Sequence, residues 1–403
     1  MNVLSALEQL AALDAAPIEL DANRCVRARD RFSTCGACTR ACPANALRVN
    51  GSVALDAEAC VACRQCVHVC PTGVFDRNDN AAELLAFLPR LKDARIVELA
   101  CARHPSPQTG PPETEAVVRI EGCLASLGPS VYLTLLASGI ERIVVRLDAC
   151  AECPIGAARP MIEQTLNTAQ VISNACRETN RITRLTEHPG KGWMRRPLYA
   201  KRTQVSRRDL FRRAIGEGQQ HVARKLALDR PGDQPDTPAE KSLPLERQRL
   251  LDALNRLLPV AAPANAEAPL EGLPFARLLV SEECTACGVC ARICPTGALQ
   301  LIIGEDDSYQ LTFQASLCTG CGICLHLCEP GALRRESPTL AELIATQPAA
   351  LRSGTLRRCQ KCGVKFAGES TASLCPVCDF RRRNPFGMRL PPGFKPGAAQ
   401  VSK

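Results

Sequence analysis

Residues 284–295 read CTACGVCARICP, and residues 318–330 read CTGCGICLHLCEP. Each stretch has three cysteines at C-x2-C-x2-C spacing and a fourth cysteine after three more residues. Proline follows the fourth cysteine directly in the first stretch and one residue later in the second. This spacing winds the backbone around one small inorganic object, so that three sulfur atoms and several N–H groups point inward, as a [4Fe–4S] cube requires.

The two stretches together resemble the bacterial dicluster [4Fe–4S] ferredoxins over residues 275–337. The resemblance implies a ferredoxin-like module that transfers single electrons at low potential. In two-cluster ferredoxins the fourth cysteine of each stretch ligates the other cluster, which ties the two halves together. The predicted ligand sets are Cys284, Cys287, Cys290 and Cys328 for one cluster, and Cys318, Cys321, Cys324 and Cys294 for its neighbour. A pair of zinc sites is the alternative for these cysteines.

A second module of this kind is predicted over residues 21–80, with one departure from the pattern. The stretch CVACRQCVHVCP at 60–71 is regular, but CGACTRACP at 35–43 lacks a first cysteine, because Phe32 stands in its place. We expect Cys25 to supply the missing thiolate. The predicted sets are Cys25, Cys35, Cys38 and Cys70 for one cluster, and Cys60, Cys63, Cys66 and Cys42 for the other. Otherwise Cys25 is a free buried thiol, and its site holds three irons or no cluster.

The closing cysteine of each stretch begins an internal repeat. The four copies are CPANALRV at 42–49, CPTGVF at 70–75, CPTGALQL at 294–301 and CEPGALRR at 328–335. Each copy reads as a cysteine, a turn and a short apolar strand. His68 and His326 each precede a last cysteine by two residues, and we expect them to pack rather than to bind metal, since each motif already has four thiolates.

Residues 94–188 predict an α/β domain. Three strand-like runs, RIVELA, AVVRIEG and RIVVRL, are separated by a loop and by the helix-like PSVYLTLLASG, and the helix-like GAARPMIEQTLNTAQ follows. Cysteines come after each strand, namely Cys101, Cys123, and the pair Cys150 and Cys153. Because the carboxyl ends of adjacent strands in an open α/β sheet meet in one crevice, these four thiolates predict a [2Fe–2S] site.

Residues 94–178 resemble the iron–sulfur delta subunit of methyl-viologen-reducing hydrogenase. The resemblance implies electron transfer between a hydrogenase or formate dehydrogenase and a heterodisulfide-reductase-type partner, through the four cysteines named above. One departure is that the family tends to have a second cysteine shortly after the first, where this chain reads Cys101-Ala-Arg-His104. Ordinary buried or free cysteines are the alternative. Cys176 lies beyond the second helix, and we expect it to be structural.

Residues 191–274 are predicted to form a basic helix followed by a Pro/Ala-rich linker. Residues 191–225 carry eleven Lys and Arg against two acidic residues, and the leucines of KSLPLERQRLLDALNRLLP recur at helical spacing. The string SRRDLF at 206–211, with the cluster motifs downstream, resembles the accessory ferredoxin of the periplasmic nitrate reductase system. The basic segment is expected either to dock an acidic redox partner or to be a solvated helix.

The segment CQKCGVKFAGESTASLCPVC, within residues 355–385, predicts a metal-binding knuckle of the zinc-ribbon or rubredoxin-like kind. Two C-x2-C pairs place four sulfurs tetrahedrally around one ion. The predicted ligands are Cys359, Cys362, Cys375 and Cys378. We expect structural zinc in preference to mononuclear iron.

Composition limits the classes of protein that fit this chain. It has 403 residues, which exceeds one ordinary domain, with 25 cysteines, 3% aromatics and a formal net charge of +9. That charge counts thiols as neutral, and six thiolate metal sites at about −2 each would leave about −3, so a nucleic-acid partner is not expected. The first 20 residues predict an amphipathic helix rather than a signal peptide, and no apolar run approaches a membrane span.

These features together predict an α+β multidomain protein with two dicluster modules, a middle α/β domain and a C-terminal knuckle. We expect a cytoplasmic iron–sulfur electron-transfer protein whose partners are redox proteins such as a formate dehydrogenase, a hydrogenase or another molybdoenzyme. No catalytic constellation is evident in the sequence, so an electron-transfer subunit is favoured over a stand-alone enzyme. The main alternative is an accessory or maturation factor for a molybdoenzyme, and a heterodisulfide-type reductase subunit is a third.

Overall fold

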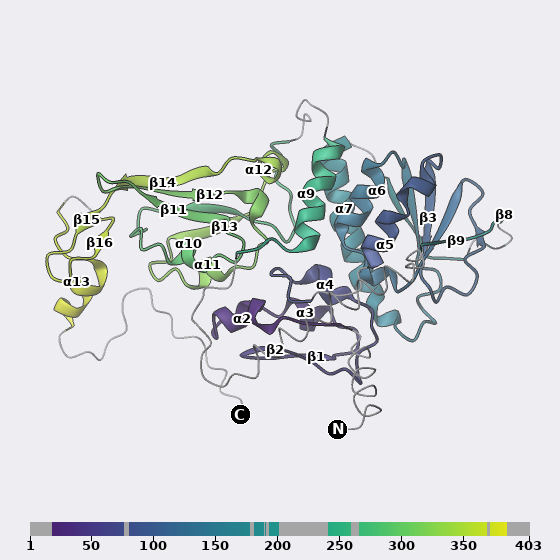
Figure 1. Ribbon diagram of the computed structural model, residues 1–403, viewed down its shortest axis with the longest axis horizontal. Coiled ribbons are helices and arrows are strands. Elements are labelled where there is room, and N and C mark those ends of the chain that lie inside the picture. The colour runs from purple at the N-terminus through teal and green to yellow at the C-terminus, as the bar shows by residue number, and fades with distance from the viewer. Residues whose placement is uncertain are drawn as a thin grey trace, which may run out of the picture.

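The structure, a computed structural model, describes residues 18–75, 80–177, 181–188, 190, 193–200, 241–258, 266–368 and 371–384. Almost all of the expected N-terminal helix lies outside these residues, as does the basic segment from residue 201 onward. Helices and strands are mixed throughout the described parts, as an α+β chain requires. The first module lies below the other parts in Figure 1, between the second module and the middle domain.

The first module is a small unit of short helices closed by short strands. The elements are the 3-10 turn η1 (Ala22–Arg24), α2 (Val26–Arg29), α3 (Ala37–Ala41), β1 (Leu47–Asn50), β2 (Ser52–Leu55) and α4 (Gln65–Val69). Strands β1 and β2 form an antiparallel hairpin, and an isolated bridge pairs Leu20 with Phe75. Its small hydrophobic core is built largely around cysteines, because six of the fifteen members or near neighbours are Cys.

The second module repeats this plan with longer strands. Its elements are β10 (Arg277–Val280), α10 (Val289–Ile293), β11 (Leu299–Ile303), β12 (Ser308–Phe313), the 3-10 turn η5 (Ala315–Leu317), α11 (Ile323–His326), β13 (Leu333–Glu336), α12 (Leu340–Ile344) and β14 (Ala349–Thr355). Strand β10 pairs with β13, and β12 lies between β11 and β14. The predicted repeat is confirmed, because the closing cysteine of three copies leads through a turn into β1, β11 or β13, and that of the fourth leads to the bridge at Phe75.

The middle region forms a parallel five-stranded sheet of order β7-β6-β3-β5-β9. The strands are β3 (Ile96–Ala100), β5 (Ala116–Ile120), β6 (Arg142–Arg146), β7 (Ile182–Leu185) and β9 (Leu198–Ala200). Helices α5 (Asn80–Ala86), α6 (Pro129–Ala137) and α7 (Arg159–Arg177) pack near it, and β4 (Thr109–Gly110) pairs with β8 (Trp193–Met194). The three predicted strands and two predicted helices are all present, and β9 extends the sheet beyond the expected boundary at residue 188.

Helix α9 (Leu245–Leu257) stands at the centre of the molecule, between the middle sheet domain and the second module (Figure 1). It buries Leu250, Ala253, Leu254 and Leu257, which recur at helical spacing and join the core that α6 and α7 form with the sheet. Leu270 and Leu273, in the stretch expected to be linker, are also buried in this core. The described part of the 241–274 stretch is therefore packed structure, because its apolar side chains cover the helical face of the middle domain.

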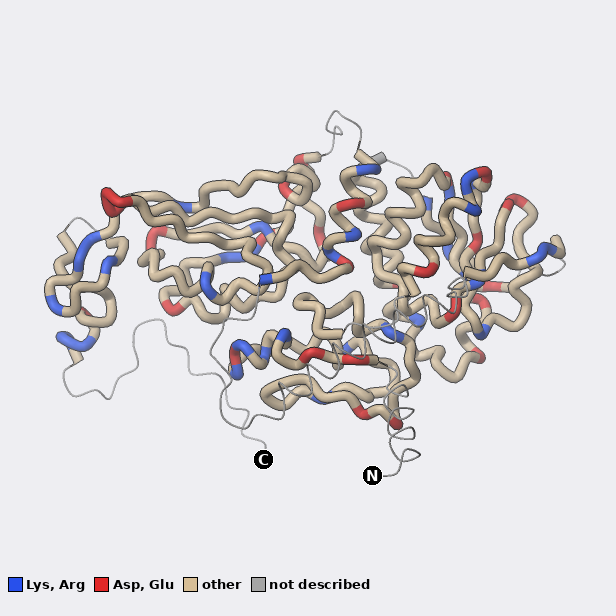
Figure 2. Tube along the Cα trace, in the orientation of Figure 1, with Lys and Arg blue, Asp and Glu red and all other residues tan. Residues whose placement is uncertain are grey.

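The C-terminal knuckle contains β15 (Arg357–Arg358), β16 (Lys365–Phe366) and α13 (Pro376–Arg383). Lys and Arg residues are dense along it, as Figure 2 shows at the left end of the molecule, and Arg381, Arg382 and Arg383 lie in the last turn of α13. Cations near a helix C-terminus interact favourably with its dipole. Among the described residues, no helix combines the length and the apolar character that crossing a bilayer requires.

Candidate functional site

In the second module the eight cysteines line two separate small cavities. One cavity is lined by Cys284, Cys287, Cys290 and Cys328. The other is lined by Cys294, Cys318, Cys321 and Cys324. These are the two predicted sets, each combining three cysteines of one stretch with the closing cysteine of the other. None of the 25 cysteines forms a disulfide, so all of these thiols remain available as ligands.

The C-x2-C-x2-C loops have an unusual backbone conformation. The residues directly before and after the second cysteine have positive φ in three loops: Ala62 and Arg64, Ala286 and Gly288, and Gly320 and Gly322. Three of these six are not glycine, although positive φ is unfavourable for L-residues with a side chain. The turn directs backbone N–H groups toward the sulfurs, and Gly320 N lies 3.4 Å from Cys318 Sγ. Such strained loops fit an anionic cluster that the N–H groups help to stabilise.

The first module gathers its cysteines in the predicted sets as well. Burial raises the pKa of the Cys38 thiol to about 12, and the nearby thiols of Cys70, Cys35 and Cys25 add to the rise. The structure therefore brings Cys25 to the thiols that lack a fourth partner. Burial also raises the pKa of the Cys66 thiol, and the thiols that add to it are those of Cys63, Cys60, Cys38 and Cys42. Three of these four form the second predicted set with Cys66, and Cys38 belongs to the first set.

The segment between Cys25 and Cys35 carries a contact that the sequence did not predict. Cys25 caps α2, and Asp30 follows the helix with a buried side chain. Asp30 Oδ2 lies 2.6 Å from Nδ1 of His326, which belongs to the second module. Phe32, which occupies the place of the missing cysteine in the motif, is largely exposed. The segment between Cys25 and Cys35, which is longer than the regular motif, therefore also joins the two modules through Asp30 and His326.

Four cysteines of the middle domain line one small cavity at the carboxyl edge of the sheet. They are Cys101, Cys123, Cys150 and Cys153. Cys101 follows β3, and Cys123 precedes the 3-10 turn η3 (Leu124–Ser126), where its Sγ lies 3.5 Å from Ala125 N. Arg103, Arg146 and Arg159 line the same cavity, although Arg146 pairs with Glu98 and Asp148 and Arg159 pairs with Glu163. Cys176 lies elsewhere, buried in the core on α7, which agrees with the expected structural role.

A buried ion-pair network supports this edge of the sheet and was not anticipated. Arg146 donates from Nε and Nη2 to both Asp148 oxygens, at 2.8 and 2.7 Å, and from Nη1 to Glu98 at 2.7 Å. His104 Nε2 lies 3.1 Å from Asp148 Oδ1, and His104 Nδ1 accepts a hydrogen bond from Ser106 N at 3.2 Å. Both ring nitrogens of His104 are thus engaged within the protein. His104 does not replace the second cysteine expected from the resemblance.

At the C-terminus Cys359, Cys362, Cys375 and Cys378 bring their sulfur atoms within 4.8 Å of one another. Among the described residues, this is the one group of metal-ligating side chains gathered so tightly. The spacing suits a single ion, whereas the wider sets of the two modules suit a larger object such as a cube. The knuckle contacts the second module, because Ala367 N donates to Thr285 O at 2.9 Å and Lys365 pairs with Asp307.

Thiols of neighbouring sets lie close enough to raise one another's pKa. Burial raises the pKa of the Cys321 thiol to about 12, and the thiols that add to it include Cys35 of the first module. Burial likewise raises the pKa of Cys123 to about 12, and Cys63 of the first module is among its neighbours. Cys63 is buried in the same core against which Cys123 packs. His68 Nε2 lies 2.9 Å from Ala125 O of the middle domain. Each of the two histidines predicted to pack therefore contacts a different domain from its own, since His326 contacts Asp30 of the first module.

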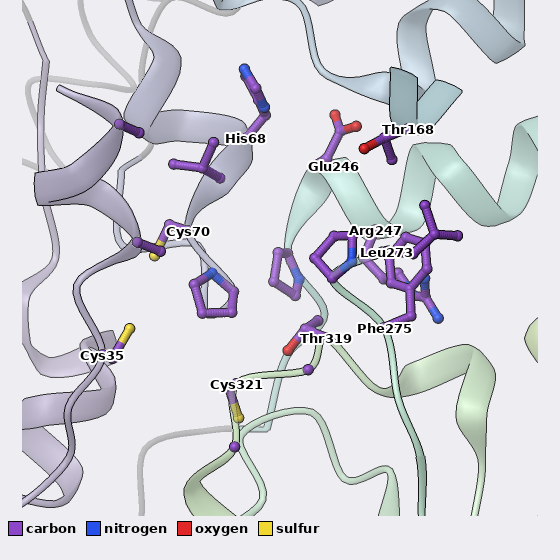
Figure 3. A pocket seen from close by; sticks show the side chains of 18 of the residues that line it. Cys35, His68, Cys70, Thr168, Glu246, Arg247, Leu273, Phe275, Thr319 and Cys321 are labelled. Carbon is purple, nitrogen blue, oxygen red and sulfur yellow. The ribbon is translucent and has the colours of Figure 1, made fainter. Parts of the chain in front are cut away.

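A cavity of about 810 Å³ lies where the modules, α7 and α9 meet. Figure 3 shows Cys35 and Cys70 of the first module on one side, Cys321 of the second module below, and Glu246 and Arg247 of α9 on the far side. Glu246 accepts hydrogen bonds from Ser130 N and Oγ at 2.9 and 2.7 Å, at the N-terminus of α6. Helix α9 therefore holds the middle domain beside both modules.

Comparison with known families identifies the two modules. The family described as 4Fe-4S dicluster domain matches residues 33–74 and 283–332. Two regions of the chain are therefore of the 4Fe-4S dicluster type, which indicates an electron-transfer role. The first match begins after Cys25, as expected where the motif is interrupted. No curated protein matches the chain.

Proposed function

We propose that this chain is a multi-cluster iron–sulfur protein that relays single electrons between a dehydrogenase- or hydrogenase-type donor and a redox acceptor. The observation that carries the proposal is the proximity of successive thiol sets, since each set includes a thiol that raises the pKa of a thiol in the next. Electron transfer through a protein needs closely spaced cofactors, and a protein that only stored clusters would have no need to align them. The two 4Fe-4S dicluster regions supply the cofactor type.

The proposed ligands are four cysteines for each of four cubes, with a [2Fe–2S] cluster in the middle domain. In this assignment Cys25 completes the set of Cys35, Cys38 and Cys70. The middle-domain cluster is held by Cys101, Cys123, Cys150 and Cys153. Arg119 and Arg159 act on the thiols of Cys101 and Cys150 in the direction that favours their charged forms. The knuckle holds zinc, since its four sulfurs lie close enough to surround one ion.

The proposed electron path connects the sets whose thiols act on one another. It begins at the Cys284 set, whose Cys290 lies among the thiols that act on Cys324 of the Cys318 set. The path then crosses between the modules from Cys321 to Cys35. Within the first module it passes from the Cys38 set to the Cys66 set. It ends in the middle domain, where Cys63 neighbours Cys123.

The partner class rests on two resemblances in the sequence. Residues 94–178 resemble a hydrogenase delta subunit, and residues 206–211 resemble part of a nitrate reductase accessory ferredoxin. Both families serve redox enzymes, so we propose a formate dehydrogenase, a hydrogenase or another molybdoenzyme as the partner. The middle-domain cluster and the Cys284 cluster are the two ends of the relay, where such partners exchange electrons with it.

The proposal is tested by the iron content and the cluster stability of the full chain purified without oxygen. We expect about 16 to 18 iron atoms per chain, from four cubes and a two-iron site. The clusters should stay bound while a viologen dye reduces and reoxidises them repeatedly. Fewer than about eight iron atoms, or transfer of the clusters to an apo-ferredoxin during incubation, would refute a relay, and cluster transfer would indicate a maturation factor instead.

A further inference from the structure

Arg247 is a buried cation beside the Cys318 thiol set. It lies in the first turn of α9 and is 4% exposed. Its Nε donates to Ser316 O at 2.8 Å and its Nη2 donates to Ala315 O at 2.9 Å. Both carbonyls belong to η5, the 3-10 turn that leads directly into Cys318. The guanidinium carbon also lies 4.3 Å from the centre of the Phe275 ring.

No carboxylate among the described residues pairs with this guanidinium, and its buried Nη1 has no hydrogen-bond partner there. Burying an unpaired charge is costly, so buried charges are normally compensated by an opposite charge. Burial lowers the pKa of Arg247 to about 10, whereas a thiolate at Cys318 acts in the opposite direction. Carbonyl dipoles and an aromatic face compensate a cation only in part.

The missing negative charge is the one that the Cys318 set would carry. Four thiolates around an oxidised cube give a net charge of about −2, and one further electron makes this charge more negative. We propose that Arg247 is the internal counter-charge of the cluster at Cys318, Cys321, Cys324 and Cys294, and that it raises the reduction potential of that cluster. The electron comes from the adjacent reduced iron–sulfur cluster, and no proton of Arg247 moves. This inference rests on the cluster assignment in the proposed function.

Arg335 provides a matched control. It also donates to backbone carbonyls, to Phe275 O at 2.9 Å and Leu273 O at 3.4 Å. Both Arg247 and Arg335 act on the thiol of Cys318 in the direction that favours its charged form. Arg335 is exposed, however, so water and salt screen its charge much more strongly. The two arginines thus differ mainly in burial.

The test compares Arg247→Met and Arg335→Met in the full chain loaded with clusters, by redox titration followed by electron paramagnetic resonance. The signal of the Cys318-set cluster is identified as the one lost in Cys321→Ser. We expect Arg247→Met to shift its midpoint potential to more negative values by an amount that salt does not change. Arg335→Met should cause a smaller shift that decreases as salt is added.

Charge and shape are separated by two further variants, Arg247→Lys and Arg247→Gln. Lysine keeps the charge, so the midpoint potential of the Cys318-set cluster in Arg247→Lys should stay close to the parent value. In Arg247→Gln the potential should shift as it does in Arg247→Met. An unchanged potential in Arg247→Met, or equal shifts in the lysine and glutamine variants, would overturn the counter-charge. If the parent chain itself lacks the signal that Cys321→Ser should remove, the cluster assignment fails instead.

Discussion

Cys25 shows how a single residue can complete a motif from outside it. The family match begins at residue 33, yet the thiol of Cys25 lies among those of Cys35, Cys38 and Cys70. Strand pairing explains this position. The bridge between Leu20 and Phe75 corresponds to the pairing of β10 with β13, so Cys25 enters the first module where Cys284 enters the second.

The Cys25→Ser variant should therefore lose or alter one N-terminal cluster. A serine hydroxyl is a much poorer iron ligand than a thiolate, so we expect one to four fewer iron atoms per chain. Electron paramagnetic resonance should show one changed signal and the others intact. Cys176→Ser is the control. Cys176 lies on α7 in the hydrophobic core of the middle domain, so this variant should leave the iron content unchanged. Equal iron contents in both variants would mean that Cys25 is not a ligand.

Some single residues could not be assigned from sequence. The spacing of cysteines predicts their grouping because thiolate ligation is local and repetitive. Nothing comparable marks Arg146, His104 and Asp148 as one network, since their pairing depends on how β3 and β6 lie side by side. Likewise, the helical pattern predicts that Arg247 is an exposed polar residue of an amphipathic helix. It is buried because the 3-10 turn η5, which is distant in sequence, covers it.

Among the elements, the segment from Cys25 to Cys35 has two roles. It returns a thiol to the first module, and it presents Asp30 to His326 of the second module. The side chain of Asp30 is 4% exposed and that of His326 is 42% exposed, so the contact lies at the edge of the junction. A hydrogen bond in this position fixes the orientation of α11 relative to the first module.

Removing this contact should loosen the junction and leave the clusters in place. In His326→Ala we expect an unchanged iron content and a weaker magnetic coupling between the reduced clusters of the two modules, measured by pulsed electron paramagnetic resonance. His188→Ala is the control, because His188 hydrogen-bonds to Ser106 on the far side of the middle domain. Coupling that is the same in both variants would show that the hydrogen bond does not orient the modules.

Most elements of the middle domain follow from sequence, and the partners of α9 do not. RIVELA, AVVRIEG and RIVVRL correspond to β3, β5 and β6. Short runs rich in β-branched residues between loops favour strands, so these three could be predicted. The leucine spacing likewise predicts α9. Periodicity indicates that one face of a helix is buried, but it does not indicate which domain covers that face. The short strands β8 and β9 carry too few residues to show a pattern.

At the scale of the whole molecule, the cysteine sites differ in whether they can hold a single metal ion or a larger iron–sulfur cluster. The four knuckle sulfurs lie within 4.8 Å of one another, whereas the thiols of the modules surround separate small cavities. We expect one zinc per chain by elemental analysis. A mild chelator should remove it and unfold the knuckle, since structural zinc contributes directly to folding.

The iron–sulfur absorbance should persist through this treatment. Cys375→Ser should give the same result without a chelator, and an exposed substitution in the same segment, Lys361→Ala, should keep the zinc. Iron in place of zinc at this site would instead extend the relay to a sixth centre beside the Cys284 set, and the absorbance of the chelated protein would then fall.

The order of the parts in space differs from their order along the chain. The first module is made early, but α9 and the second module, which complete the cavity beside Cys35 and Cys70, are made only after the whole middle domain. At a synthesis rate of about 5–20 residues per second, the interval between the two modules is on the order of ten to fifty seconds. Until then this cavity has no wall from the second module. Cluster delivery to the first module thus has a time window, which the arrival of the second module ends.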